Sequence, residues 1–141
     1  MAFAGINYLA IIVAAVVAWI AGAAWYMALG KAWMGAHGWA SPADAPKRTG
    51  AASAAPFVIS FVAEIVMAWV LAGMIGHLGP GEVTVRNGII SAAFAWVGFV
   101  ATTVIVNNAY PGKPWLLTII DAGHWLVVLL LMGAIIGAFG V

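Results

Sequence analysis

Four long apolar stretches, each almost free of charge, are the feature that most limits what this chain can fold into. They cover about residues 5–29, 54–78, 85–107 and 115–139. About 20 apolar residues cross the hydrocarbon core of a bilayer as a helix, because a helix satisfies its backbone hydrogen bonds internally. The sequence therefore predicts an all-α polytopic membrane protein, with residues 1–141 forming a single membrane domain built as a bundle of four transmembrane helices.

The composition excludes several classes of protein. The chain is 66% hydrophobic, with only five Lys and Arg and four Asp and Glu, which is too few to cover a water-soluble globule. A net charge of +1 gives no basic patch for nucleic acid, and the lack of cysteine excludes thiolate metal sites and cysteine nucleophiles. No catalytic motif is present, so we expect no enzyme activity and no cofactor, and the lipid bilayer as the main partner.

The connections predict an orientation. Two are short turns rich in Gly and Pro, whereas residues 30–53 form a long loop. Four basic residues lie in or beside the long loop and the last turn, Lys31, Lys47, Arg48 and Lys113, whereas the opposite side of the membrane has only Arg86. By the positive-inside rule these two connections are cytoplasmic, which predicts a bacterial inner-membrane protein with both termini outside.

A short internal match suggests a repeat. Gly30-Lys31-Ala32-Trp33 follows the first stretch, and Gly112-Lys113-Pro114-Trp115 follows the third. One interpretation is two like-oriented hairpin repeats related by an axis along the membrane normal. The alternative is that Lys and Trp at a membrane interface need no repeat to explain them.

Two acidic residues lie inside apolar stretches, where a charged side chain is costly and is often functional. Glu64 and Asp121 are about 15 and 9 Å from the cytoplasmic ends of their helices, at 1.5 Å per residue, so the two could approach each other. We interpret them as proton or cation sites. In the alternative they are protonated or hydrogen-bonded and only fix helix register; the candidate polar partners are Thr102, Asn107, Asn108 and Lys31.

His124 shares a helix face with Asp121, because the two are spaced i, i+3. This pair is typical of a proton relay, or of a hydrogen bond that holds the helix in place. A metal site in a bundle needs more ligands than one Asp-x-x-His and one Glu, so we predict no metal.

Each predicted helix carries one tryptophan near mid-membrane: Trp19, Trp69, Trp96 and Trp125. Turned inward, they would form the aromatic walls of a site for a flat or cationic ligand. Turned outward, they would face lipid or fill space between helices.

Small residues form stripes on two helices. Ala10, Ala14, Ala18 and Gly22 repeat at i+4 in the first, and Gly133 and Gly137 form a G-x-x-x-G in the last. Such stripes let helices approach closely, in the bundle or in a homo-oligomer.

Several short motifs follow one another along nearly the whole chain: Gly22-Ala23-Ala24-Trp25-Tyr26, Gly30-Lys31-Ala32-Trp33, Trp96-Val97-Gly98-Phe99, Asn107-Asn108, Lys113-Pro114-Trp115, Asp121-Ala122-Gly123 and Met132-Gly133-Ala134-Ile135. As an ordered set they resemble a widespread family of short bacterial four-helix membrane proteins, catalogued as a domain of unknown function. The resemblance implies fold and membrane location and supplies no reaction. Family members often have a proline-containing insertion that Met27-Ala28-Leu29 lacks, and an aromatic residue where His124 stands, so a role for His124 does not follow from it.

Two functions are consistent with these observations. The first is binding or proton-linked transport of a small cationic or aromatic solute, with Glu64, Asp121 and His124 as proton or cation sites and the tryptophans as walls. The alternative is a non-catalytic accessory or assembly subunit that packs against a larger membrane complex through its small-residue stripes.

Overall fold

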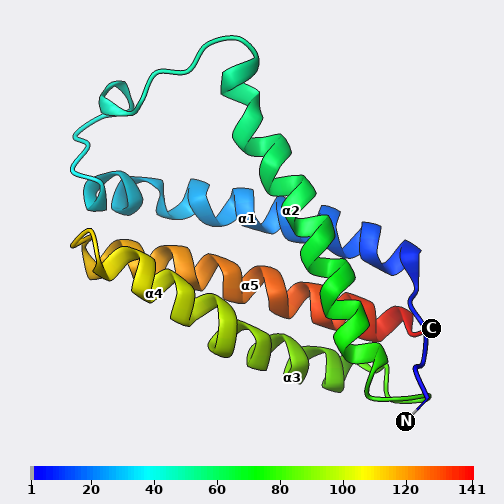
Figure 1. Ribbon diagram of the computed structural model, residues 1–141. Coiled ribbons are helices and arrows are strands. Elements are labelled where there is room, and N and C mark those ends of the chain that lie inside the picture. Colours follow the sequence, from blue (N-terminus) through cyan, green and yellow to red (C-terminus); the bar gives the residue numbers. More distant parts are fainter. Residues whose placement is uncertain (1) are drawn as a thin grey trace.

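The computed structural model describes residues 2–141, which form helices joined by short turns and one longer loop (Figure 1). In chain order the elements are α1 (Tyr8–Ala36), the 3-10 turn η1 (Pro42–Asp44), α2 (Ala51–Gly76), α3 (Val85–Ala95), the π-helical segment η2 (Trp96–Ala101), α4 (Thr102–Ala109) and α5 (Trp115–Phe139). α3, η2 and α4 continue as one span, so four helices of the described chain are long and apolar enough to cross a membrane. The predicted all-α fold with four spans is confirmed.

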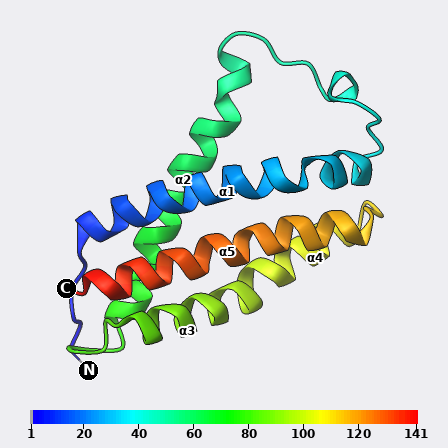
Figure 2. The same ribbon diagram turned by 180° about the vertical axis from the view of Figure 1, so that it is seen from behind.

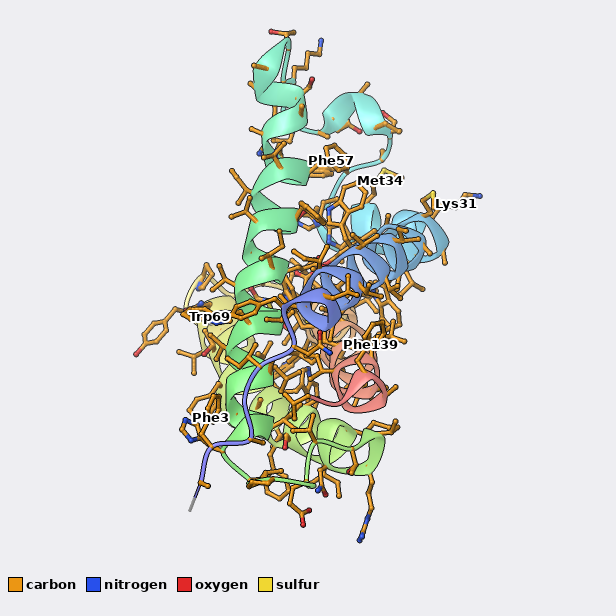
Figure 3. All side chains as sticks on the ribbon, turned by 90° about the vertical axis from the view of Figure 1, so that its right-hand side faces the viewer. Phe3, Lys31, Met34, Phe57, Trp69 and Phe139 are labelled. Atoms are coloured by element: carbon orange, nitrogen blue, oxygen red, sulfur yellow. The ribbon has the colours of Figure 1, made fainter. Side chains whose placement is uncertain are left out.

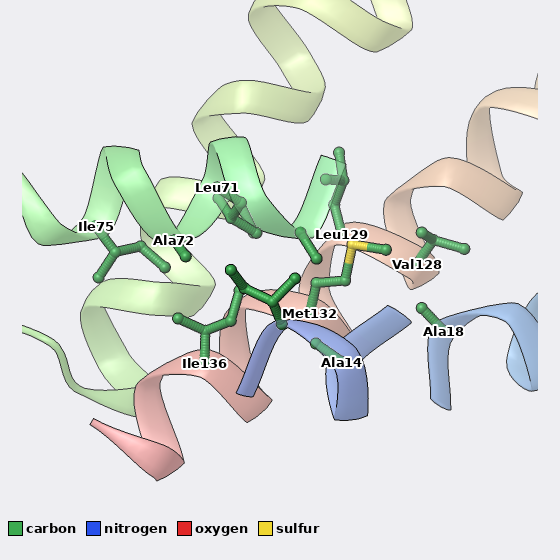
Figure 4. Packing of buried hydrophobic residues seen from close by; sticks show 12 residues of the cluster. Ala14, Ala18, Leu71, Ala72, Ile75, Val128, Leu129, Met132 and Ile136 are labelled. Carbon is green, nitrogen blue, oxygen red and sulfur yellow. The ribbon is translucent and has the colours of Figure 1, made fainter. Parts of the chain in front are cut away.

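α5 is the central helix of the bundle. It packs mainly against α1 and against α3, and it has more buried residues than any other element. Its side chains meet those of α1 and α2 in the core shown in Figure 4, where the labelled residues are Ala14, Ala18, Leu71, Ala72, Ile75, Val128, Leu129, Met132 and Ile136. α5 is apolar on nearly all sides, as expected of a helix whose faces contact either other helices or lipid.

Both small-residue stripes lie at contacts within the chain. On α1, Ala10, Ala14, Ala18 and Gly22 are all buried. On α5, Gly133 lies against the backbone of Gly88, and Gly137 lies against the backbone of Thr84 at the start of α3. These contacts are between backbones, which only residues without a bulky side chain permit.

α2 diverges from the other helices. Its C-terminal half packs on the bundle, whereas its N-terminal half leads away from α1 toward the loop, in both views of the ribbon (Figures 1 and 2). No residue of 51–63 is buried, and Glu64 is the first buried residue of the helix. Between the diverging helices is an apolar groove of about 440 Å³, lined by Val16, Trp19, Ile20, Phe57, Val58 and Phe61.

The first helix is longer than its sequence predicts. The predicted end near residue 29 is wrong, because α1 continues through Gly30 and Lys31 to Ala36, and the loop to α2 is correspondingly shorter. Contacts between helices account for the extension, since Trp33 in the added turns packs on Tyr26 and bonds to α5. The two hairpins run in the same direction, but α1 and α2 diverge whereas the third span stays beside α5 (Figure 1).

Candidate functional site

Asp121 accepts two hydrogen bonds from α1. The hydroxyl of Tyr26 donates to its Oδ1 at 2.8 Å, and the indole Nε1 of Trp33 donates to the same oxygen at 3.2 Å. Tyr26 and Trp33 are seven residues apart and therefore lie on one face of the helix. Both donors are uncharged and both use Oδ1, so within residues 2–141 no hydrogen bond reaches Oδ2.

Two further indoles fix the backbone of α5 on either side of Asp121. Trp25 of α1 donates to the carbonyl of Ile120 at 3.1 Å, and Trp96 donates to the carbonyl of Ala122 at 2.8 Å. Gly123 makes room for the Trp25 ring, because a Cβ there would lie 3.0 Å from that ring. Three indoles and one phenol from two helices thus converge on residues 120–123 of α5. We call the four donors, Trp25, Tyr26, Trp33 and Trp96, the aromatic clamp.

His124 lies one turn beyond Asp121 in the same interface. It is 7% exposed, and its ring packs against Tyr26 at a centroid distance of 4.8 Å and against Trp125 at 4.7 Å. Gly22 of α1 admits the ring, since a Cβ at Gly22 would lie 2.5 Å from the His124 Nε2. The Nδ1 atom is buried and has no hydrogen-bond partner among residues 2–141.

Glu64 lies apart from Asp121. Trp19 donates to the hydroxyl of Ser60 at 3.0 Å, which sets the level of α2 against α1. Glu64 comes one turn after Ser60, farther toward the chain termini, whereas Asp121 bonds to Tyr26, seven residues beyond Trp19 toward the loop. At least seven residues of α1 therefore separate the levels of the two acids, which is about 10 Å or more along the bundle. The expectation that they approach each other is wrong, because it treated α2 and α5 as equally inclined.

The predicted polar partners do not bond to either acid. The hydroxyl of Thr102 donates to the carbonyl of Gly98 in its own helix at 2.9 Å. Asn108 is buried and donates to Thr118 at 3.1 Å, which joins α4 to α5. Asn107 is exposed. Lys31 is also exposed (Figure 3).

The four mid-membrane tryptophans do not line one cage. Trp19 faces α2, where it contacts Phe61 edge-on at 6.0 Å. Trp96 belongs to the aromatic clamp, and Trp125 packs against the core beside His124. Trp69 is 52% exposed on the outside of α2 (Figure 3). The direction in which each indole points depends on helix rotation, which this sequence pattern does not specify.

Sequence reasoning missed three members of the aromatic clamp. Trp25, Tyr26 and Trp33 are absent from the predicted site residues, and the predicted end of the helix near residue 29 leaves Trp33 outside it. The signal that would have found them is the spacing of seven between Tyr26 and Trp33, with no proline between them. No group of three or more His, Asp or Glu residues in the described part of the chain is arranged to hold a metal ion.

The fold and this site define a class, a four-helix multi-pass membrane protein with a hydrogen-bonded carboxyl group between α1 and α5. Within that class the chain belongs to the family described as "Protein of unknown function (DUF1761)", which it matches over residues 9–137. This match confirms the resemblance to a domain of unknown function. No curated protein and no solved structure matches the chain.

Proposed function

We propose that this protein binds a small cationic solute at Asp121 and exchanges it for protons across the membrane. The observation that carries the proposal is the asymmetry of the Asp121 carboxyl group. Two donors hold Oδ1, while no residue of the described range 2–141 bonds to Oδ2. Neither donor neutralises the charge, so the site attracts a cation in a medium of low dielectric constant.

The aromatic rings around Asp121 favour an aromatic or other organic cation as the proposed solute. Tyr26 and Trp33 contact each other edge-on at 5.8 Å, and the Tyr26 ring also packs on His124. Rings next to a carboxylate stabilise an organic cation by cation–π attraction in addition to the charge pair. The walls of the proposed site are therefore clamp residues of α1 rather than the mid-membrane tryptophans.

His124 is the proposed proton carrier of the exchange. Its imidazole is one turn from Asp121, and its Nδ1 atom is buried without a partner. A proton on His124 and a cation at Asp121 would repel each other, so loading of one site favours emptying of the other.

We further propose that the protein lies in a bacterial inner membrane with both termini outside. Lys31 and Lys113 are at the end of the bundle where α1 ends and α5 begins, whereas Arg86 is at the opposite end. The excess of basic residues at the first end supports its cytoplasmic location. The Asp121 site would then lie in the cytoplasmic half of the bundle.

Binding and exchange are testable with benzyltrimethylammonium, an aromatic quaternary ammonium ion. We expect saturable binding to the purified protein and uptake into proteoliposomes that depends on a pH gradient. Asp121→Asn should abolish both, and Asp44→Asn, which changes an exposed acid in η1, should leave both unchanged. Equal binding by wild type and Asp121→Asn, or no saturable binding by wild type, would refute the proposal.

The apolar groove favours a second candidate, an accessory subunit of a larger membrane complex. The N-terminal half of α2 lies apart from α1, and an added helix of a partner would fill the groove between them. Purification in mild detergent separates the candidates. A stoichiometric larger partner supports the subunit, and a monomer or homo-oligomer supports the transporter.

A further inference from the structure

Glu64 is a buried ionisable side chain that makes no side-chain hydrogen bond to any other described residue. It is 2% exposed, and its Oε2 atom makes no hydrogen bond. Only one other buried side-chain polar atom in residues 2–141 is unpartnered, the Nδ1 atom of His124. Buried polar groups are ordinarily hydrogen-bonded, so an unpartnered carboxyl oxygen needs an explanation.

The surroundings of Glu64 supply no charge to balance an anion. At its level the buried residues of α1 and α5 are apolar, including Ala14, Ala18 and Val128. The titratable groups of the packed helices lie at other levels: Tyr26, Lys31, Asp121 and His124 toward the loop end, and Tyr8 and Arg86 toward the termini. An ionised Glu64 would therefore be a buried charge without a counter-ion, which is strongly unfavourable.

Glu64 also marks the point where α2 leaves the bundle. From Glu64 onward the inner face of α2 is buried, with Ala68, Leu71 and Ile75 in the core (Figure 4). One and two turns earlier on the same face are Phe61 and Phe57, which line the apolar groove. A small outward movement of α2 at this point would open a path for water from the groove to the carboxyl group.

We propose that Glu64 is a proton-binding site, separate from Asp121, that controls how closely α2 packs against α1. The neutral carboxyl group is compatible with the packed arrangement of the structure. When the proton is lost to water, the carboxylate is hydrated only if α2 moves away from α1 and the groove widens. The inference does not depend on solute binding at Asp121, because it concerns the helix position in the solute-free protein.

The absence of cysteine allows a direct test by spin labelling. Labels at Val17→Cys and Ile59→Cys report the distance between α1 and α2, since both residues are exposed and neither lines the groove. Labels at Val17→Cys and Ile119→Cys report the distance between α1 and α5, which the aromatic clamp holds together. We expect the first distance to lengthen from mildly acidic to alkaline pH, and the second to stay constant.

The variant Glu64→Gln tests whether Glu64 is the group that causes the pH-dependent change in the α1 to α2 distance. Glutamine keeps the size of the side chain and cannot lose a proton in this range, so the α1 to α2 distance should remain at its acidic value. An unchanged α1 to α5 distance shows that the variant is folded. Glu82→Gln, which changes an exposed acid before α3, should leave the pH response intact. A constant α1 to α2 distance in wild type, or the same pH response in Glu64→Gln, would overturn the proposal.

Discussion

Alanine in place of Gly133 tests whether α3 and α5 are held together by contact between their backbones. A Cβ at Gly133 would overlap the carbonyl group of Gly88 and lie 3.0 Å from the Cβ of Ala92. Backbone atoms inside two helices cannot turn aside as the end of a side chain can. The helices would have to separate along the whole contact, which also affects Gly137 against Thr84.

Gly73 of α2 provides the matched control, because a Cβ there would meet nothing within 4 Å. Alanine favours a helix over glycine by about 0.8–1.0 kcal/mol, so Gly73→Ala should raise the free energy of unfolding by up to about 1 kcal/mol. Gly133→Ala gains the same propensity but also overpacks the contact. Overpacking costs about 1–3 kcal/mol, and the upper end applies to a rigid obstacle, so the net loss should be about 2 kcal/mol.

Unfolding by sodium dodecyl sulfate in mixed micelles, followed by circular dichroism, measures both variants. We expect Gly133→Ala to unfold at a lower fraction of dodecyl sulfate than wild type, and Gly73→Ala at an equal or higher fraction. If the two variants unfolded together, backbone contact between α3 and α5 would not be what stabilises the bundle.

The same assay tests the aromatic clamp. Tyr26→Phe removes a donor to a charged acceptor and should lower the free energy of unfolding by about 1.5–3 kcal/mol, whereas Tyr110→Phe, at an exposed position, should change it little. Trp96→Phe removes a bond to a neutral carbonyl and should cost about 1 kcal/mol, compared with little change for Trp69→Phe on the outer surface. Equal effects within either pair would contradict the assigned contacts.

The number of spans and the close helix contacts could be predicted from the sequence because both depend on local properties. A charge-free stretch of sufficient length has no alternative to a helix in lipid. Small residues at i+4 on α1 and α5 mark surfaces where another backbone can approach, although the pattern alone does not name the partner helix. The nearness of Asp121 and His124 likewise follows from their spacing on one helix.

The tertiary arrangement of the site could not be predicted from local properties. Gly30 and Lys31 resemble a helix boundary, and what keeps α1 helical beyond them is the bond from Trp33 to α5. The separation of Glu64 from Asp121 depends on the inclination of α2, which counting residues from a helix end does not include. Whether a tryptophan faces lipid or another helix depends on rotation, as the contrast between Trp69 and Trp96 shows.

The Asp121-Ala122-Gly123 motif contributes a different contact through each of its residues. Asp121 accepts hydrogen bonds from Tyr26 and Trp33 through its side chain. Ala122 accepts a hydrogen bond from the Trp96 indole through its carbonyl group, and Gly123 leaves space for the Trp25 indole. These partners come from other motifs of the ordered set, far away in the chain. Four motifs of the set, those that contain Trp25, Trp33, Trp96 and Asp121, therefore meet in one three-dimensional cluster.

His124 contacts this cluster by packing of its ring on Tyr26. An aromatic hydrocarbon ring at that position can also pack on Tyr26 provided that Gly22 leaves room, but it cannot carry a proton. The proposed binding at Asp121 and the proposed proton transfer through His124 are thus physically separable. A phenylalanine at position 124 that preserved the clamp would retain the first and lose the second.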